Sequence, residues 1–146
     1  MIGLIQRVTK AKITIEGQSI CKIKTGLLVL VAVQPNDNED IVERLAKKIS
    51  TYRIFPDENG RMNKSITDKN YELMLVPQFT LAADTAKGAR PSFTHAANPE
   101  TGKKYFDLLY KSCIKRVKKT YCGVFGEYMK ISLTNDGPAT FWLEVN

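Results

Sequence analysis

A short polar segment follows an apolar run near the middle of the chain. Residues 73–76 read Leu-Met-Leu-Val, and Pro77, Gln78 and Thr80 come directly after them. Burying an amide or a hydroxyl without a partner costs about 1–3 kcal/mol on mutational scales. These polar groups must therefore be hydrogen-bonded within the protein or face a ligand.

Thr80 is a candidate nucleophile. A threonine hydroxyl attacks an acyl group only when a base activates it, and no such base lies close to Thr80 in sequence. A threonine that hydrogen-bonds across neighbouring strands is the commoner case. The following loop carries Lys87, Gly88, Arg90 and Pro91, so a cationic segment adjoins the polar one.

A second polar segment, Asn-Asp-Gly-Pro-Ala-Thr at residues 135–140, divides the apolar C-terminal region. Asn, Asp, Gly and Pro all favour turns, so a hairpin turn is the simplest interpretation. The Gly137–Pro138 bond is expected to be trans, because only about 5–6% of such bonds in folded proteins are cis.

The sequence lacks most familiar catalytic and cofactor-binding motifs. It contains no GxxxxGK[ST], GxGxxG, HExxH, GxSxG or paired CxxC pattern. The chain has only one histidine, His95, so a histidine-rich metal centre is excluded. A lone histidine in a loop is more often a surface group. The sequence therefore predicts no metal and no cofactor.

Alternating apolar and polar residues predict strands through most of the chain. The expected strands cover residues 2–9, 11–16, 19–24, 27–33, 52–55, 71–76, 127–134 and 139–145. Turn residues such as Gly17, Pro35 and Gly60 separate them. We expect most of these strands to pair antiparallel.

Two helices are also expected. Asp37 or Asn38 can cap the first, whose apolar stripe consists of Ile41, Val42, Leu45, Ala46 and Ile49. Asn98 followed by Pro99 begins the second, because proline suits the first helical position. Its core face consists of Phe106, Leu109, Cys113 and Val117. Strands with two helices of this kind indicate an α+β fold.

Composition indicates one soluble domain over residues 1–146, with 43% hydrophobic and 25% charged residues. Three cysteines without CxxC spacing favour reduced thiols in a reducing compartment. No stretch approaches the roughly 18 apolar residues of a membrane span. We therefore expect a cytoplasmic protein without membrane association.

Basic residues are concentrated in one segment of a chain whose net charge is +7. Residues 101–120 contain seven basic side chains against the single acid Asp107. Four of them form a stripe on the expected second helix: Lys104, Lys111, Lys115 and Lys118. A solvated helix face is the commoner explanation for such a stripe, and a polyanionic partner is the alternative.

Five segments together resemble one enzyme family. They are MIGLIQRVTKAKITIEG, GLLVLVAV, YRIFPDENGRMN, QFTLAADTAKGARPSF and NDGPATFWLEV, which span nearly the whole chain. The last two match the motifs Ser-Gln-Phe-Thr and Asn-x-Gly-Pro-x-Thr of the D-aminoacyl-tRNA deacylases. Both motifs occur at the separation found in that family. The chain therefore resembles an enzyme family that hydrolyses D-aminoacyl-tRNA.

The resemblance implies a barrel-like assembly of sheets with two main helices outside it. It also implies a homodimer whose active sites lie at the subunit interface, each holding the 3′-terminal adenosine of an aminoacyl-tRNA. In this family the pocket is built around the residues that match Gln78, Phe79 and Thr80. Met129, Phe125 and Arg7 match positions that line or brace it.

The second motif implies a chirality filter. In the family the pair matching Gly137–Pro138 is cis and reaches into the partner's pocket. Its carbonyl oxygens admit a D-amino acid or glycine and collide with an L side chain. The resemblance therefore predicts release of D-amino acids from tRNA and action on mischarged glycyl-tRNA.

The ester between an amino acid and ribose is already activated, so its hydrolysis needs positioning and an oxyanion site more than a strong base. Backbone N–H groups near Phe79 and Thr80 are candidates for that site, with the ribose 2′-OH assisting proton transfer. We favour this route over Thr80 as a nucleophile. Lys87 and Arg90 are the nearer candidates for tRNA phosphates, with Lys104 and Lys111 on the helical stripe.

Pro77 departs from the family pattern, which has serine there. Proline offers neither a hydroxyl nor an N–H, and must lie at a strand edge, bulge or strand start. An alternative is therefore a non-catalytic tRNA-binding homodimer that the change to Pro77 inactivated. A generic interaction domain is a third possibility.

Overall fold

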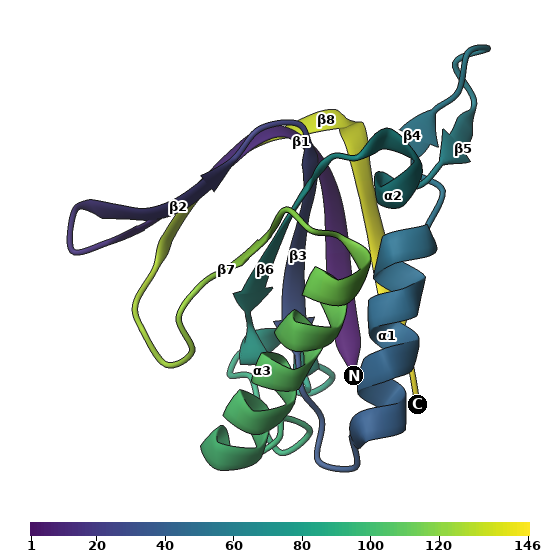
Figure 1. Cartoon of the computed structure of the whole chain (residues 1–146). Coiled ribbons are helices and arrows are strands. Elements are labelled where there is room, and N and C mark those ends of the chain that lie inside the picture. The colour runs from purple at the N-terminus through teal and green to yellow at the C-terminus, as the bar shows by residue number, and fades with distance from the viewer.

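The computed structural model describes residues 1–146 as one curled, mixed sheet with two long helices side by side on one face (Figure 1). The strands of this sheet are β1 (Ile2–Ile15), β2 (Gln18–Ile23), β3 (Gly26–Ala32), β6 (Glu72–Pro77), β7 (Thr120–Cys122) and β8 (Lys130–Glu144). The long helices are α1 (Glu39–Thr51) and α3 (Pro99–Arg116). A small hairpin of β4 (Phe55–Pro56) and β5 (Met62–Lys64), the short α2 (Ile66–Lys69) and the 3-10 helix η1 (Phe79–Ala82) complete the fold.

The sheet curls because β1 changes partners along its length. Its first half pairs with β3 and its second half with β2, while β8 pairs with both halves, all antiparallel. β6 joins β3 in parallel, and β7 joins β6 in parallel. The α+β class and the barrel-like sheet are confirmed, with these two parallel pairings inside a mostly antiparallel assembly.

Both predicted helices are present with the expected buried faces. Asn38 caps α1 by accepting a hydrogen bond from the Ile41 N–H, whereas Asp37 binds the Met1 ammonium at 2.6 Å. Asn98 caps α3 through the Thr101 N–H. Every residue of the two predicted apolar faces is buried, and these faces form the main core against the sheet. No helix is both long and apolar enough to cross a membrane.

Several strand predictions were wrong. Residues 2–9 and 11–16 form one strand rather than two. The expected strand 52–55 is almost absent, because α1 runs to Thr51 and only Phe55 and Pro56 pair. Lys118, expected on the helical stripe, lies beyond the end of α3 at Arg116.

The C-terminal hairpin was also predicted wrongly. Residues 130–144 form a single strand that stays beside β1 throughout. The register with β1 shifts around Arg7, so residues 136–139 bulge out instead of turning back. The Gly137–Pro138 bond in this bulge is cis, contrary to the statistical expectation of trans.

Candidate active site

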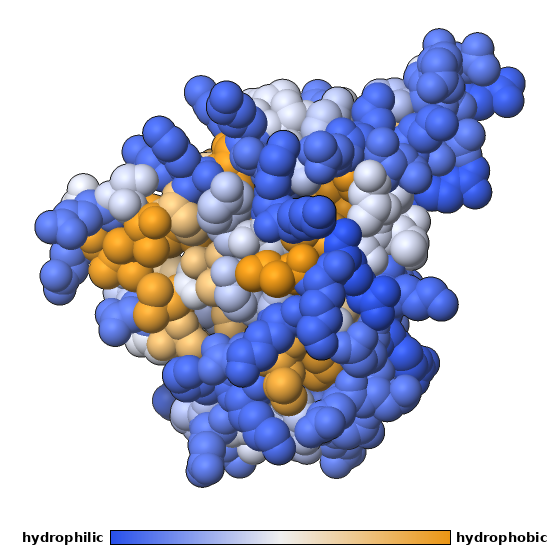
Figure 2. Space-filling model, in the orientation of Figure 1, coloured by the Kyte–Doolittle hydropathy of each residue, from blue (hydrophilic) through white to orange (hydrophobic).

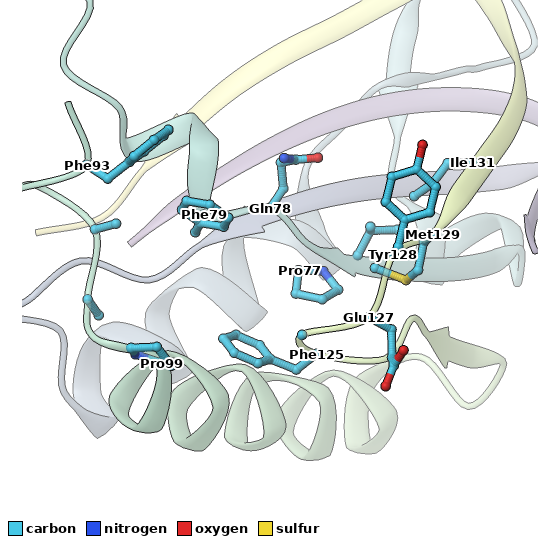
Figure 3. Close-up of a pocket in the computed structure, with 14 residues that line it drawn as sticks. Pro77, Gln78, Phe79, Phe93, Pro99, Phe125, Glu127, Tyr128, Met129 and Ile131 are labelled. Carbon is cyan, nitrogen blue, oxygen red and sulfur yellow. The ribbon is translucent and has the colours of Figure 1, made fainter. Parts of the chain in front are cut away.

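The C-terminal end of β6 opens into a cavity of about 570 Å³. Figure 3 shows Pro77 in its middle, Phe79 and Phe93 on one side, and Tyr128 and Met129 on the other. The remaining lining residues are Val76, Gln78, Ala96, Ala97, Pro99, Phe125, Gly126, Glu127 and Ile131. The walls are mostly apolar, as is usual for a small-ligand pocket. Figure 2 shows apolar side chains gathered at the surface between β2 and the loop that joins β7 to β8.

Pro77 occupies the last position of β6, where one side of the strand has no neighbour. The Gln78 N–H bonds the Val31 carbonyl on the β3 side at 2.7 Å. On the other side, the last bond to the segment after β7 runs from the Gly123 N–H to the Leu75 carbonyl. Because backbone groups alternate between the two sides of a strand, residue 77 faces the open side. A proline fits there without removing a bond from the sheet.

The polar side chains after Pro77 bond each other. The Gln78 Nε2 donates a hydrogen bond to the Thr80 Oγ1. Phe79 and Thr80 begin η1, and neither of their backbone N–H groups donates to an acceptor in the chain. The first N–H groups of a helical turn have no partner inside it. Two adjacent amide donors are thus available beside the cavity.

Aromatic side chains shape the cavity walls. Phe79 and Phe93 meet edge to face, with ring centroids 5.1 Å apart. Phe125 packs over α3, where Gly102 makes room for it, because a Cβ at that position would lie 3.0 Å from the Phe125 ring. Tyr128 is 83% exposed, although it lines the cavity. So large an exposed aromatic surface is suited to contact with a flat ligand or a partner.

No activated base or thiol serves this cavity. Its only titratable lining side chains are Glu127 and Tyr128, and the Glu127 carboxylate points away from Gln78 (Figure 3). Burial raises the pKa of the Cys122 thiol, in β7 just before the cavity loop, and of the Cys21 thiol beside it. A raised pKa leaves little reactive thiolate. The exposed His95 lies in a different hollow, beside Thr94 and Asn36.

The Gly137–Pro138 bulge is braced from three directions. The Arg7 Nε donates to the Asp136 carbonyl at 2.9 Å, and its Nη1 donates to the Ile54 carbonyl at 2.7 Å. The Asn135 Oδ1 accepts from the Ala139 N–H at 2.7 Å. The Asn135 Nδ2 also donates to the Thr140 Oγ1 at 2.8 Å. These bonds explain why Asn135 and Thr140 flank the Gly-Pro pair. Gly137 and Pro138 themselves are exposed.

The bulge and the cavity lie at opposite ends of the sheet within one chain. Arg7 stands opposite Leu27, whereas Gly3 stands opposite Val31, whose other neighbour is Pro77. Four residues along a strand span about 14 Å. Neither Gly137 nor Pro138 lines the cavity of its own chain.

The structure places the other predicted residues as follows. Phe125 and Met129 line the cavity with Gln78 and Phe79, and Thr80 adjoins it. Lys87 and Arg90 are exposed in the loop that leads to Phe93. Lys104 and Lys111 are exposed on α3, and the Lys104 ammonium lies 5.0 Å from the Tyr105 ring centroid.

Sequence reasoning missed Phe93, Pro99 and Tyr128 as cavity residues. Phe93 ends the cationic loop, and Tyr128 follows the turn residue Gly126. An aromatic residue in an otherwise polar loop was the available signal for both. Pro99 gave no such signal, because its position is fully explained by the start of α3.

A sequence model of the family described as D-Tyr-tRNA(Tyr) deacylase matches residues 4–144. The chain belongs to this family. A D-aminoacyl-tRNA deacylase of Hahella chejuensis is 51% identical and covers 99% of both chains. One from Nitrosococcus oceani is 48% identical and covers 99% of this chain and 94% of its own.

Two solved structures share this fold. A protein titled c-Myc DNA Unwinding Element Binding Protein is 36% identical, with a TM-score of 0.95, and the match covers 100% of this chain and 99% of that one. A probable eukaryotic D-amino acid tRNA deacylase is 12% identical, with a TM-score of 0.84 over 97% of this chain and 98% of that one. The second likeness concerns the fold alone.

Proposed function

We propose that this chain hydrolyses the ester bond of D-aminoacyl-tRNA and releases a D-amino acid and tRNA. The observation that carries the proposal is the largely apolar cavity at the end of β6, with the free amides of Phe79 and Thr80 beside it and no activated side-chain base. Such a site suits an acyl ester that is already activated and needs orientation more than proton abstraction. Membership in the deacylase family supports the same substrate class.

The proposed reaction is a water attack assisted by the substrate. The 3′-terminal adenosine lies among the aromatic walls, and water adds to the ester carbonyl carbon. The N–H groups of Phe79 and Thr80 stabilise the oxyanion that forms. The ribose 2′-OH relays the proton, and the 3′-oxygen leaves protonated. Gln78 orients Thr80 and the ester, and Thr80 forms no covalent bond to the acyl group.

Chirality is selected by exclusion. We infer that the carbonyl oxygens of Gly137 and Pro138 from a partner subunit border the α-carbon of the bound amino acid. An L side chain collides with them, whereas a D side chain points away and glycine has none. One steric rule of this kind rejects all L-amino acids and tolerates many D-amino acids.

A homodimer is therefore part of the proposal. The bulge cannot fill the cavity of its own chain, about 14 Å away along the sheet, yet it is exposed and firmly braced. Its strand, β8, pairs only with β1, which leaves one long strand edge open. Trp142 on this strand is 51% exposed. Open edges and exposed aromatic side chains are features that a subunit interface would cover.

The deciding experiment compares hydrolysis of D-tyrosyl-tRNA and L-tyrosyl-tRNA at one enzyme concentration. We expect the D-ester to be cleaved while the L-ester persists. Equal cleavage of both would refute the filter. Glycyl-tRNA is a third substrate and should also be cleaved.

A non-catalytic nucleic-acid-binding homodimer is the second candidate. Pro77 in place of serine favours it, as does the DNA-binding title of the 36%-identical structure. This candidate predicts tight, salt-sensitive tRNA binding without hydrolysis. It also predicts that Pro77→Ser creates activity absent from the natural chain, whereas our proposal requires activity with Pro77 in place.

We place this activity in the cytoplasm. Its substrates arise where tRNA is charged, and the three cysteines are all free. Free thiols in a folded protein are expected in a reducing compartment.

A further inference from the structure

Three lysines line a second groove, on the part of the sheet that curls away from the helices. Lys10 and Lys12 belong to β1 and Lys22 to β2. They border a hollow of about 360 Å³ together with Ser132 and Thr134 of β8. All five side chains are exposed, and none of the three lysines was among the residues suspected from the sequence.

The pairing of the strands places these side chains in rows. Lys12 stands opposite Lys22 on one side and opposite Ser132 on the other. Lys10 stands opposite Thr134. Residues two apart on a strand share a face, so all three ammonium groups and both hydroxyls belong to one surface.

This arrangement is unfavourable unless an anion is present. Like charges directly opposite each other on neighbouring strands destabilise a sheet, and Lys12 and Lys22 are such a pair. No carboxylate forms an ion pair with any of the three lysines. On α3, Lys103 pairs with Asp107 at 2.6 Å and Arg116 pairs with Glu43 at 3.0 Å, whereas Lys104, Lys111 and Lys115 form no ion pair. The groove thus concentrates positive charge that the protein itself does not neutralise.

The groove also adjoins the candidate active site along the chain. Ile131 lines the cavity, and the next residue, Ser132, lines the groove on the opposite face of β8, because successive side chains on a strand alternate between faces. Ammonium and hydroxyl groups are the usual donors to phosphate oxygens in nucleic-acid complexes. Because β8 pairs only with β1, its other edge is open, and a long polyanion bound in the cavity can reach this groove by crossing that edge.

We propose that Lys10, Lys12 and Lys22 bind backbone phosphates of the tRNA beyond its 3′-terminal adenosine. The inference rests on the proposed function, which supplies the tRNA. It assigns affinity for the body of the tRNA to the groove, while the cavity handles the ester. Contacts of this kind raise affinity without reading sequence.

The test uses the triple variant Lys10→Gln/Lys12→Gln/Lys22→Gln and two substrates. One is D-tyrosyl-tRNA, and the other is 3′-O-D-tyrosyl adenosine, which has no phosphate to reach the groove. We expect KM for the tRNA ester to rise about tenfold or more with kcat little changed, because each lost phosphate contact removes counterion release. Hydrolysis of the adenosine ester should keep its wild-type kcat/KM.

Salt dependence supplies a second readout. The slope of log affinity for uncharged tRNA against log salt should fall by about 2–3 in the triple variant, at roughly 0.7–0.9 per lost contact. The matched control is Lys47→Gln/Lys48→Gln/Lys69→Gln, which changes net charge equally on α1 and α2. It should retain the wild-type slope. Arginine at the three groove positions should restore affinity.

Each result decides the matter. Unchanged tRNA KM and slope in the groove variant would overturn the proposal, as would an equal loss in the control. Loss of adenosine-ester hydrolysis in the groove variant would also overturn it, by showing damage to the cavity. If duplex DNA bound with the same affinity and the same salt dependence as tRNA, the assignment of the groove to tRNA would be wrong. If the natural protein cleaves neither ester, the proposed function fails, and the binding slope still tests the groove.

Discussion

Thr80 illustrates how one hydrogen bond constrains a mechanism. Its hydroxyl accepts from the Gln78 amide, a group that cannot take a proton from it. The one carboxylate that lines the cavity, Glu127, points away from Gln78 (Figure 3), and His95 lies in a different hollow. A threonine placed in this way can position a neighbour but has nothing to activate it as a nucleophile.

We therefore expect Thr80→Ala to keep turnover of D-tyrosyl-tRNA within about tenfold of wild type, which corresponds to roughly 1.4 kcal/mol. Single-turnover kinetics at saturating enzyme measure this directly. A covalent role for Thr80 would appear instead as a loss of several orders of magnitude that Thr80→Ser repairs.

Gly137 is constrained both by its backbone conformation and by the neighbouring Arg7 side chain. Its φ of +135° is one that L side chains rarely adopt, and an added Cβ would lie 2.9 Å from the Arg7 Nη2. Any side chain here must shift the bulge or its arginine. Because the filter depends on where the Gly137 carbonyl lies, such a shift should weaken selection rather than hydrolysis itself.

Gly137→Ala is expected to lower the ratio of D-ester to L-ester hydrolysis at least tenfold, about 1.4 kcal/mol. The paired tyrosyl-tRNA assay measures it. The control is Gly60→Ala, at a positive φ of 76° with nothing within 4 Å of the added Cβ. That control also places a methyl group at a positive φ, in the hairpin of β4 and β5 rather than in the bulge, and should leave the ratio unchanged.

Elements with a clear apolar period were predictable, and those shaped by their neighbours were not. α1, α3 and β3 each carry a complete buried pattern in their own residues. The segment 52–55 contains strand-forming residues, but α1 extends to Thr51, and only Phe55 of this segment pairs in a strand. Residues 135–138 favour a turn, so β8 was predicted as two strands, but pairing with β1 on both sides of the bulge keeps it one strand.

The candidate site was predictable to a similar extent. The motif residues Gln78, Phe79 and Thr80 came from resemblance, and the structure brings them together with Phe125 and Met129. The walls formed by Phe93 and Tyr128 depend on loops that fold back, and no local pattern reports that. The groove lysines could not be predicted from local sequence either, because only the register between β1 and β2 places Lys22 opposite Lys12.

The parallel pairing of β3 with β6 positions the cavity, and it begins at a point of close approach. Gly26 stands opposite Glu72, and an added Cβ would lie 1.8 Å from the Glu72 carbonyl oxygen. A backbone atom cannot move aside as a side chain can. The strand that ends in Pro77 would have to shift along its whole length.

Gly26→Ala should therefore lower the free energy of unfolding by about 1–3 kcal/mol or more, measured by urea denaturation. Gly3→Ala is the matched control, because its Cβ would meet only side-chain atoms, the nearest at 3.5 Å. We expect that control to unfold near the wild-type midpoint. A stable Gly26→Ala with normal activity would contradict the register described for β3 and β6.

At the scale of the whole molecule, the two halves of the proposed machinery lie on different subunits. In the proposed dimer, one chain contributes the cavity around Gln78 and the other contributes the bulge at Gly137. A two-fold dimer would contain two such composite sites. This division makes a prediction that no single-chain mechanism shares.

Mixed dimers of Gln78→Ala and Gly137→Phe should recover activity that neither variant has alone. The Gln78 change impairs the cavity, and a phenyl ring at 137 should block the partner's cavity. Random exchange makes about half of the dimers mixed, each with one intact site, so about a quarter of wild-type turnover is expected. Separately purified variants, mixed after partial unfolding and refolding, provide the measurement. Absence of recovery in verified mixed dimers would place both groups within one chain.

β8 carries three separate tasks in one run of sequence. Ile131 borders the cavity, Ser132 and Thr134 border the groove, and Gly137 and Pro138 form the bulge. Adding or deleting one residue in a strand turns every following side chain to the opposite face. Evolution can therefore exchange residues within this stretch, but a change in its length would misplace the parts beyond it. The length of β8 is therefore constrained by the positions of all three sites, whereas a single exposed residue is constrained only by its own site.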